Sequence, residues 1–297
     1  MELPHFLLDP WIRRKARLAS IDLGRFQIRL ARSAKEYEDA FRLIHLAYAY
    51  QGIEPLRRLD LRVTEQHVLS EAVVLVAYEG EQLVGTISVT KDSPAKLPLD
   101  KDYGDEITTL RRSGAQISEI GSLAIVRRCW HSGLMPLLGL AASRVCFRIH
   151  GSTHNVIGVH PKAAAVYHAM WNFHQLGNAH HHAELEAPVI GLVQERSATR
   201  THLIKHYRAY PNGLNPAEYC FGESSPSGLE LPEGVAEQAW PRLKMPREVF
   251  RSIFIEQTGL LSKLSPATLH HLRTQRSEET VGVRAQAPQV LKDVNVS

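Results

Sequence analysis

One acidic residue, Glu119, stands in an otherwise uncharged stretch that runs from Gln116 to Val126 and reads QISEIGSLAIV. A carboxylate inside a strand of that polarity is costly to bury unless it is paired with a cation or used in chemistry. The residue type suits proton transfer or ion pairing, and the stretch contains no second charge to pair with it. Glu119 is therefore the best candidate for a chemical centre, with pairing to a core arginine as the alternative.

The basic residues are concentrated next to this acid. The whole chain has 297 residues, 44% hydrophobic and 22% charged, with a net charge of only +4. Between Arg111 and His150, however, Glu119 is the only acid, and six arginines surround it in sequence: Arg111, Arg112, Arg127, Arg128, Arg144 and Arg148. A local positive field suits an anionic ligand or an acidic protein partner. A solvated helix face explains the same residues equally well.

The histidines and cysteines do not indicate a metal site. The chain has 16 histidines, and His174 with 180–182 forms the densest group, but consecutive residues of an extended segment point to opposite faces. No Asp, Glu or Cys accompanies them at ligand spacing, so we expect no metal. The three cysteines, Cys129, Cys146 and Cys220, are odd in number and lack metal-type spacing. They predict free thiols in a reducing cytoplasm.

The elements that must position these residues follow from hydrophobic periodicity. Ser33 and Glu36 form a capping box at the start of a helix, and Glu79-Gly80-Glu81 separates the two strands of a hairpin. The predicted strands cover 26–31, 72–78, 82–90, 116–126, 155–159 and 188–194, and the predicted helices cover 33–51, 134–150 and 163–173. This order predicts an α/β (α+β) domain with a mixed central sheet flanked by helices.

Composition divides the chain into five parts. We expect an N-terminal arm at 1–25, a catalytic domain at 26–210, a Pro- and Gly-rich linker at 211–245, a helical C-terminal extension at 246–275 and a disordered tail at 276–297. The basic face of the arm is compatible with peripheral membrane contact. The longest apolar stretch is too short to span a bilayer, and the first residues do not read as a signal peptide. A cytoplasmic protein is therefore expected.

The element order and several short motifs resemble the FeeM-like N-acyl amino acid synthases. These are GNAT-fold acyltransferases related to acyl-homoserine lactone synthases. The resemblance covers roughly residues 26–196, and each motif is weak alone, whereas their order and spacing together are fairly specific. The matching positions are Leu110-Arg111, Gly114, Glu119, Ser122-Leu123-Ala124-Ile125, His160-Pro161, Tyr167 and Leu176-Gly177.

The resemblance implies transfer of a long-chain acyl group from a thioester to the α-amino group of an amino acid. That amino group must lose a proton before it attacks, and Glu119 is the expected general base. The tetrahedral oxyanion needs donors, which the family supplies from a strand bulge. Gly121 is the expected bulge residue, because glycine inside a strand often marks one, and Ser122 and Leu123 adjoin it in the acyl-binding stretch.

Two further groups of residues are expected in the site. Tyr167 occupies the position of the tyrosine that protonates the leaving thiolate in many GNAT enzymes, and a core aromatic is the alternative. His45 and Tyr48 belong to the helix that lines the amino-acid pocket in the family. They suit a core position equally well.

The segment after the Glu119 strand bears on the acyl carrier. Relatives that use acyl-CoA have a loop with two glycines whose backbone amides hold the pyrophosphate. The corresponding residues, Arg127, Arg128, His131, Ser132 and Gly133, include one glycine only, and Trp130 intrudes. An acyl carrier protein delivers a phosphopantetheine arm without an adenosine pyrophosphate, and it is acidic. We therefore expect acyl carrier protein (ACP) as the partner, with an acyl-phosphopantetheine thioester as co-substrate and no cofactor.

Three other functions remain open at this point. Acyl-homoserine lactone synthesis is disfavoured because Ser122 stands where such synthases place an arginine. An acyl-CoA-dependent N-acyltransferase and a non-catalytic acyl-ACP-binding protein would keep the same fold. Nucleic-acid binding is the least favoured, because the basic residues lack an aromatic platform or a recognition helix.

Overall fold

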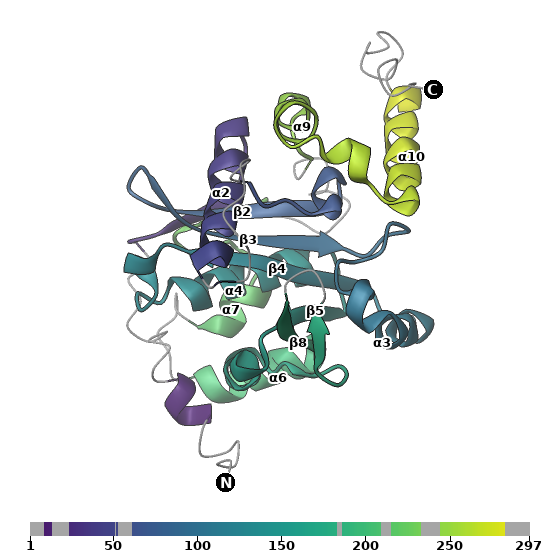
Figure 1. Cartoon of the computed structure of the whole chain (residues 1–297). Helices are drawn as coiled ribbons and strands as arrows, with labels where there is room; N and C mark the ends of the chain where they lie inside the picture. Colours follow the sequence, from purple (N-terminus) through teal and green to yellow (C-terminus); the bar gives the residue numbers. More distant parts are fainter. Residues whose placement is uncertain are drawn as a thin grey trace.

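The computed structural model describes residues 9–13, 24–50, 52, 61–182, 186–208, 215–232 and 244–282 (Figure 1). Within these residues, a nine-stranded sheet has the order β6-β8-β5-β4-β3-β2-β1-β9, with β7 paired to β8. The strands are β1 (Gln27–Leu30), β2 (Ala72–Glu79), β3 (Gln82–Lys91), β4 (Ile117–Ile125), β5 (His154–Val159), β6 (His174–Gln175), β7 (His180–His182), β8 (Ala187–Glu195) and β9 (Leu229–Glu230). Neighbours are antiparallel except for the β4–β5 and β1–β9 pairs, which are parallel.

Helices flank this sheet, which confirms the predicted architecture. The α-helices are α2 (Ala34–Tyr50), α3 (Asp100–Arg112), α4 (Leu134–Arg144), α5 (Ala164–Trp171), α6 (Arg196–Tyr207), α7 (Pro216–Phe221), α9 (Arg247–Phe250) and α10 (Pro266–Gly282). Short 3₁₀ turns are η2 (Glu65–Val68), η3 (Arg127–Cys129), η5 (Pro161–Ala163) and η7 (Leu260–Lys263), and π-helical turns are η4 (Val145–Ile149) and η6 (Arg251–Gln257).

Local sequence signals explain the elements around the centre of the sheet. The Ser33 Oγ accepts the Glu36 N–H at 3.3 Å and the Glu36 carboxylate accepts the Ser33 N–H at 3.2 Å, so the predicted capping box starts α2. The strands β2 and β3 form the predicted antiparallel hairpin. The strand that carries Glu119 and both helices after it lie where periodicity predicts them.

The sheet separates two apolar layers. On one face, β-strand side chains pack with α4, α5, α6 and α7 in a single large core cluster. On the other face, one cluster joins α2, α9 and η6, and a smaller one joins α3 to β4 and β5. Figure 1 shows α2 and α9 on one side of the sheet and α4 and α7 on the opposite side. Alternate residues of β3 and β4 therefore face different layers.

Two regions differ from the sequence-based expectation. The predicted helices include none before β4, where the structure has the 13-residue helix α3. The stretch 211–245, expected to be a linker, contributes α7 and β9 where it is described. Tyr219 and Leu229 are buried in the main core, and β9 pairs with β1, so these residues are part of the folded domain.

The helical extension packs against the α2 face of the sheet. The Phe254 ring lies 6.3 Å from the Phe41 ring of α2, and α10 contacts the segment around η2. The predicted tail lies mostly outside the described residues, which end at Gly282. In the arm, Arg13 of the helix at 9–13 donates to the Ala169 carbonyl at 3.1 Å. Among the helices of the described part, none is both long and apolar enough to cross a membrane.

Candidate active site

Glu119 lies at the last residue through which β4 pairs with β5. The parallel ladder joins 117–119 to 154–156, whereas β4 continues to Ile125 and β5 to Val159. Within the described residues, the later parts of the two strands have no ladder partner in each other, so the strands diverge directly after Glu119. Half-buried apolar side chains that pack on the main core, among them Leu123, Ile125 and Val159, follow on both strands.

The Glu119 carboxyl is buried in a setting that favours its neutral form. The residue is 8% exposed, and its Oε2 accepts the Leu99 backbone N–H at 2.8 Å. Burial raises the pKa of Glu119 to about 8, and the nearby carboxylates of Asp100 and Asp102 act in the same direction against the Leu99 hydrogen bond. A carboxyl with this pKa holds or releases a proton near neutral pH, as a general base must.

A backbone irregularity follows Glu119 in β4. The register between β3 and β4 shifts between Thr86 and Ser88, opposite the stretch from Gly121 to Ala124. The left-handed residue in this bulge is Ser122, with φ of 51°, and not Gly121, which was expected to carry the distortion. Gly121 instead leaves room, because a Cβ placed on it would meet only the Glu119 Oε1, at 3.9 Å. The bulge therefore presents backbone and open space beside the carboxyl.

Tyr167 lies among aromatic side chains that pack on the main core. Tyr167 of α5 packs against the rings of Trp171 (5.4 Å) and Phe173 (6.0 Å). Burial raises the pKa of Tyr167 to about 12, with a smaller contribution from Tyr48 of α2. The phenol therefore keeps its proton at neutral pH and is available as a donor. His45, one turn earlier in α2, is buried with 1% of its surface exposed.

The loop that leads from β4 to α4 is exposed and aromatic. The Arg127 guanidinium lies over the rings of Tyr50 (5.3 Å) and Trp130 (6.0 Å), which contact each other edge-on at 5.9 Å. Arg128 pairs with Glu79 and donates to Gln82 at 2.8 Å, so its charge is partly neutralised.

The end of this loop shapes the start of α4. Gly133 has φ of 87°, which suits glycine, and His131 is exposed. The Ser132 Oγ accepts the Leu134 N–H at 3.3 Å and donates to the Cys129 carbonyl at 2.7 Å. The Ser132 hydroxyl therefore accepts one of the backbone N–H groups at the helix N-terminus, and such N–H groups are the donors that bind phosphate in other proteins.

Arg111 of the Leu110-Arg111 motif stabilises the start of α3, which lies next to Glu119. Its guanidinium donates to both carboxylate oxygens of Asp92 at 2.7 Å and to both of Asp100 at 2.6 Å. Asp100 also accepts the Leu97 N–H at 2.8 Å. This network holds the start of α3, and with it the Leu99 N–H that binds Glu119.

A buried polar group beside the site escaped sequence analysis. His67 of η2 lies 3.0 Å from the Ser88 hydroxyl, and Ser88 faces Gly121 across the β3–β4 ladder. Arg62 lies 4.3 Å above the Tyr48 ring, and its charge acts on His67. The available signal was the alternation of Thr86, Ser88 and Thr90 with apolar residues in β3, which places three hydroxyls on one face.

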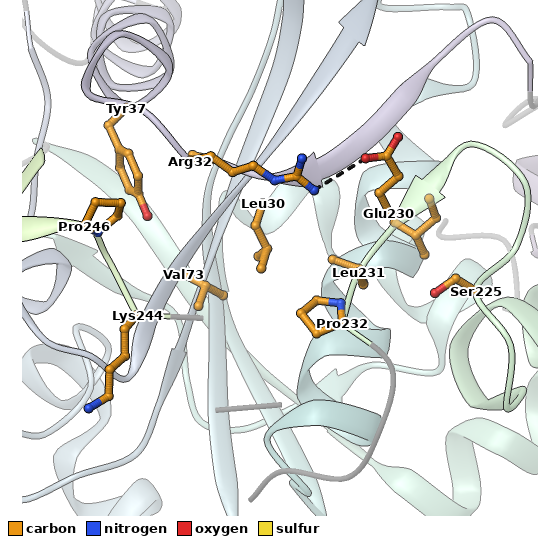
Figure 2. Close-up of a pocket in the computed structure, with 12 residues that line it drawn as sticks. Leu30, Arg32, Tyr37, Val73, Ser225, Glu230, Leu231, Pro232, Lys244 and Pro246 are labelled. Atoms are coloured by element: carbon orange, nitrogen blue, oxygen red, sulfur yellow. Dashed lines mark hydrogen bonds and ion pairs between the residues drawn. The ribbon is translucent and has the colours of Figure 1, made fainter. Parts of the chain in front are cut away.

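A pocket of about 670 Å³ lies away from these residues (Figure 2). It is found where β1 and β9 end, and Arg32, Tyr37, Glu230 and Lys244 are among its lining residues. Neither Glu119, nor Tyr167, nor the bulge contributes to it. This pocket is therefore separate from the Glu119 region.

Comparison with known proteins identifies the family of the chain. A family model described as N-acyl amino acid synthase FeeM matches residues 39–194, more than half of the chain. The matched region runs from α2 to β8 and includes Glu119, the bulge and Tyr167. No curated protein sequence matches the chain.

Solved structures share the fold at low sequence identity. The structure of FeeM, an N-acyl amino acid synthase from uncultured soil microbes, has a TM-score of 0.52 and 21% identity, over 62% of this chain and 99% of that chain. BjaI, a CoA-dependent acyl-homoserine lactone synthase, has a TM-score of 0.49 and 18% identity, over 73% and 98% of the two chains. The FeeM likeness confirms the GNAT-type fold, and much of the present chain lies outside it.

Proposed function

The chain belongs to the N-acyl amino acid synthase FeeM family of acyltransferases, and from this membership we propose that it transfers a long-chain fatty acyl group from acyl-ACP to the α-amino group of an amino acid. The observation that carries the proposal is the placement of Glu119. Its buried carboxyl, with a pKa of about 8, lies where β4 and β5 separate and beside a bulge. We further propose a cytoplasmic setting, which suits the three buried free thiols.

The proposed reaction is aminolysis of a thioester. Glu119 takes a proton from the ammonium form of the amino acid, and the free amine attacks the acyl carbonyl carbon. Backbone N–H groups at the Gly121–Leu123 bulge stabilise the oxyanion that forms. The C–N bond forms and the C–S bond breaks. The Tyr167 hydroxyl donates a hydrogen bond to the departing sulfur. Of the two protons that the ammonium loses, one converts the thiolate to the thiol and the other passes to solvent, so that the products are an N-acyl amino acid and ACP thiol.

Two features of the 127–133 loop support ACP over coenzyme A as the carrier. The Ser132 hydroxyl occupies the Leu134 N–H that a pyrophosphate would use. The exposed Arg127 guanidinium, which lies over the rings of Tyr50 and Trp130, offers a positive charge beside an apolar surface to an acidic partner. The half-buried apolar residues after Glu119 suit the fatty chain, since each buried CH₂ contributes about 0.8 kcal/mol.

The purified protein, incubated with palmitoyl-ACP and each of the common amino acids, should form an N-acyl amino acid that mass spectrometry detects. The Glu119→Gln variant should lose roughly 100-fold or more of this rate, because a positioned base contributes on the order of 10²–10⁴-fold. Glu81→Gln, an exposed acid in the β2–β3 turn, is the control and should keep full activity. Wild-type rates in Glu119→Gln would refute its role as the base, and absence of product with every amino acid would refute the proposed reaction.

The carrier is tested separately by comparing palmitoyl-ACP with palmitoyl-CoA. Arg127→Glu should raise the KM for acyl-ACP about 10-fold, which corresponds to the loss of roughly 1.4 kcal/mol at an interface, and should weaken its salt dependence. Arg251→Glu, an exposed arginine of η6, should leave this KM unchanged. A higher kcat/KM with palmitoyl-CoA than with palmitoyl-ACP would identify coenzyme A as the carrier.

A further inference from the structure

The His67–Ser88 pair lies along β3, the neighbour of β4 on the edge away from β5, and the proposed reaction has not used it. β5 lies on one side of β4, and β3 with η2 and α2 lies on the other. If the acyl thioester enters where β4 and β5 separate, the acceptor must approach from the β3 side. Ser88 and Thr90 of β3 pair with Gly121 and Glu119 of β4, so their hydroxyls face the same side of the sheet as the carboxyl.

The hydrogen bonds of His67 determine which way the Ser88 hydroxyl is used. The backbone N–H of Thr64 donates to His67 Nδ1 at 2.9 Å, and an N–H can only donate, so Nδ1 carries no proton. Burial, helped by the charge of Arg62, lowers the pKa of His67 to about 4, and the ring is therefore neutral at pH 7. A neutral imidazole with an unprotonated Nδ1 has its proton on Nε2. The Nε2–H thus donates to the Ser88 Oγ, 3.0 Å away.

This polarity excludes one role for the pair and indicates another. A serine nucleophile needs an unprotonated imidazole nitrogen to take its proton, and the Nε2 that faces Ser88 is already protonated. The Ser88 O–H therefore remains a donor, and the described residues provide no acceptor for it. The ladder places Gly121 opposite Ser88, and the Glu119 Oε1, at 3.9 Å, is the sole described atom within 4 Å of a Cβ placed on Gly121.

Positive charge lies along the same side. The Arg62 guanidinium stacks on Tyr48, and Tyr48 in turn acts on Tyr167. Stacking uses the face of a guanidinium, and its N–H donors lie along the edge, in the geometry that suits a carboxylate. The Arg62 charge also acts on His67, the residue that holds the Ser88 hydroxyl.

We propose that the Ser88 hydroxyl, aligned by Thr64 and His67 and lying in the positive field of Arg62, binds the α-carboxylate of the acceptor and directs its amino group to Glu119. Ser88 touches the substrate, and His67 is a positioning residue that acts through Ser88. The subsite selects α-amino acids over amines that lack the carboxylate. The inference rests on the proposed N-acylation and adds the residues that recognise the acceptor.

The test compares the best-accepted amino acid with its carboxamide, which keeps the amine and side chain but lacks the negative charge. The wild-type protein should prefer the acid by at least 10-fold in kcat/KM, since hydrogen bonds to charged groups contribute about 1.5–3 kcal/mol. Ser88→Ala should raise the KM for the acid about 10-fold, reduce the preference over the carboxamide, and leave the KM for palmitoyl-ACP unchanged. His67→Phe should act like Ser88→Ala, whereas His67→Gln, whose amide can replace the Nε2 donor, should keep most of the preference.

Thr86→Val is the matched control. Thr86 lies two residues from Ser88 on the same face of β3, but its buried hydroxyl donates to the Leu75 carbonyl at 2.8 Å. Its removal should lower stability without changing the preference for the acid. An acid-to-carboxamide ratio that is the same in Ser88→Ala and in the wild-type protein would overturn the inference.

Calorimetric titration of the same two ligands into the wild-type protein and Ser88→Ala reads the subsite without turnover. Tighter binding of the acid that disappears in Ser88→Ala supports the subsite even if no product forms, in which case only the proposed reaction fails. Product formation with equal binding of both ligands would refute the subsite and leave the reaction intact.

Discussion

The carboxyl of Glu119 is held in a place where its neutral form is favoured, and this has two measurable consequences. The first is catalytic. Because only the ionised carboxylate can accept the proton of the acceptor, kcat/KM should rise about 10-fold per pH unit below pH 8 and level off above it. Rates measured with two acceptors whose amines differ in pKa distinguish ionisation of Glu119 from ionisation of the acceptor amine. An inflection that follows the acceptor amine and never stays near pH 8 would contradict the assignment.

The second consequence concerns stability. The pKa of Glu119 is raised from 4.5 in the unfolded chain to about 8 in the fold. Between these two values the unfolded state loses its proton first, so the free energy of unfolding falls as the pH rises from about 4.5 to 8. Glutamine cannot ionise and can still accept the Leu99 N–H. Glu119→Gln should therefore be more stable than the wild-type protein by roughly 4 kcal/mol at pH 8, and the difference should nearly vanish at about pH 4.5. A pH-independent difference in thermal denaturation would contradict this.

At the scale of elements, the environment of Glu119 depends on the ion pairs that hold the start of α3 in place. Arg111 joins the carboxylates of Asp92 and Asp100, and the three side chains are at most 25% exposed. Replacing Arg111 with Met leaves two partly buried carboxylates without their cation, which should lower the free energy of unfolding by roughly 2–4 kcal/mol. Because the start of α3 supplies the Leu99 N–H, the pH inflection of the rate should also move upward. Urea denaturation and the pH profile check both effects, and an unchanged profile in a folded variant would separate Arg111 from the site.

Elements with a local signal could be predicted from the sequence, and those fixed by long-range contacts could not. The Ser33–Glu36 capping box and the turn after Glu79 are recognisable within a few residues, and Glu119 is conspicuous because its strand is otherwise uncharged. In contrast, α3 buries only Tyr103 and Ile107 of its 13 residues, which is too few to establish a helical period. The strand β9 exists only because β1, two hundred residues earlier, pairs with it.

The same division holds within the site. Residue type indicated Glu119 and, through Gly121, a bulge in its strand, whereas Tyr167 was expected from the family resemblance. The left-handed backbone of Ser122 is imposed by the packing around it, and no property of serine indicates it. The His67–Ser88 pair joins residues of a 3₁₀ turn and a strand 21 positions apart. Neither residue is unusual alone, and only the register of β3 on β4 places Ser88 beside Gly121.

Over the whole molecule, buried histidines make the fold sensitive to acid. Burial lowers the pKa of His67 to about 4, of His150 to about 3 and of His202 to about 4, all from an ordinary value of 6.5. Below pH 6.5 the unfolded state binds these protons and the folded state does not, so the stability that the three histidines contribute is complete above pH 6.5 and is lost as the pH falls towards 4, which outweighs the opposite contribution of the single Glu119. Thermal denaturation should show a falling Tm over this interval. The His202→Gln variant, which removes one of the three protons, should show a shallower slope, and an unchanged slope would contradict the assignment to His202.

The C-terminal extension connects the far end of the chain to the acceptor side of the site. The Glu65 carboxylate accepts the Ser265 N–H at 2.9 Å and the Thr268 hydroxyl at 3.0 Å, and Glu65 begins η2, the turn that carries His67. Immediately after η2, Glu71 binds His271 of α10 at 2.8 Å. The solved FeeM structure covers only 62% of this chain, and the FeeM family match ends at residue 194. The extension thus supports a turn inside the matched region from outside it.

Weakening the contact between Glu65 and residues 265–268 should raise the KM for the amino acid and leave the KM for the acyl donor unchanged. Glu65→Ala removes both hydrogen bonds from α10 and should let η2 shift, so that His67 no longer aligns Ser88. We expect the KM for the amino acid to rise roughly 3- to 10-fold, as for the loss of one to two hydrogen bonds of about 1 kcal/mol each, with the KM for palmitoyl-ACP unchanged. Glu256→Ala breaks only an exposed pair with Arg251 in the same extension and serves as the control. An equal change in both KM values would mean that the extension stabilises the fold in general, because only displacement of η2 acts on one substrate and not the other.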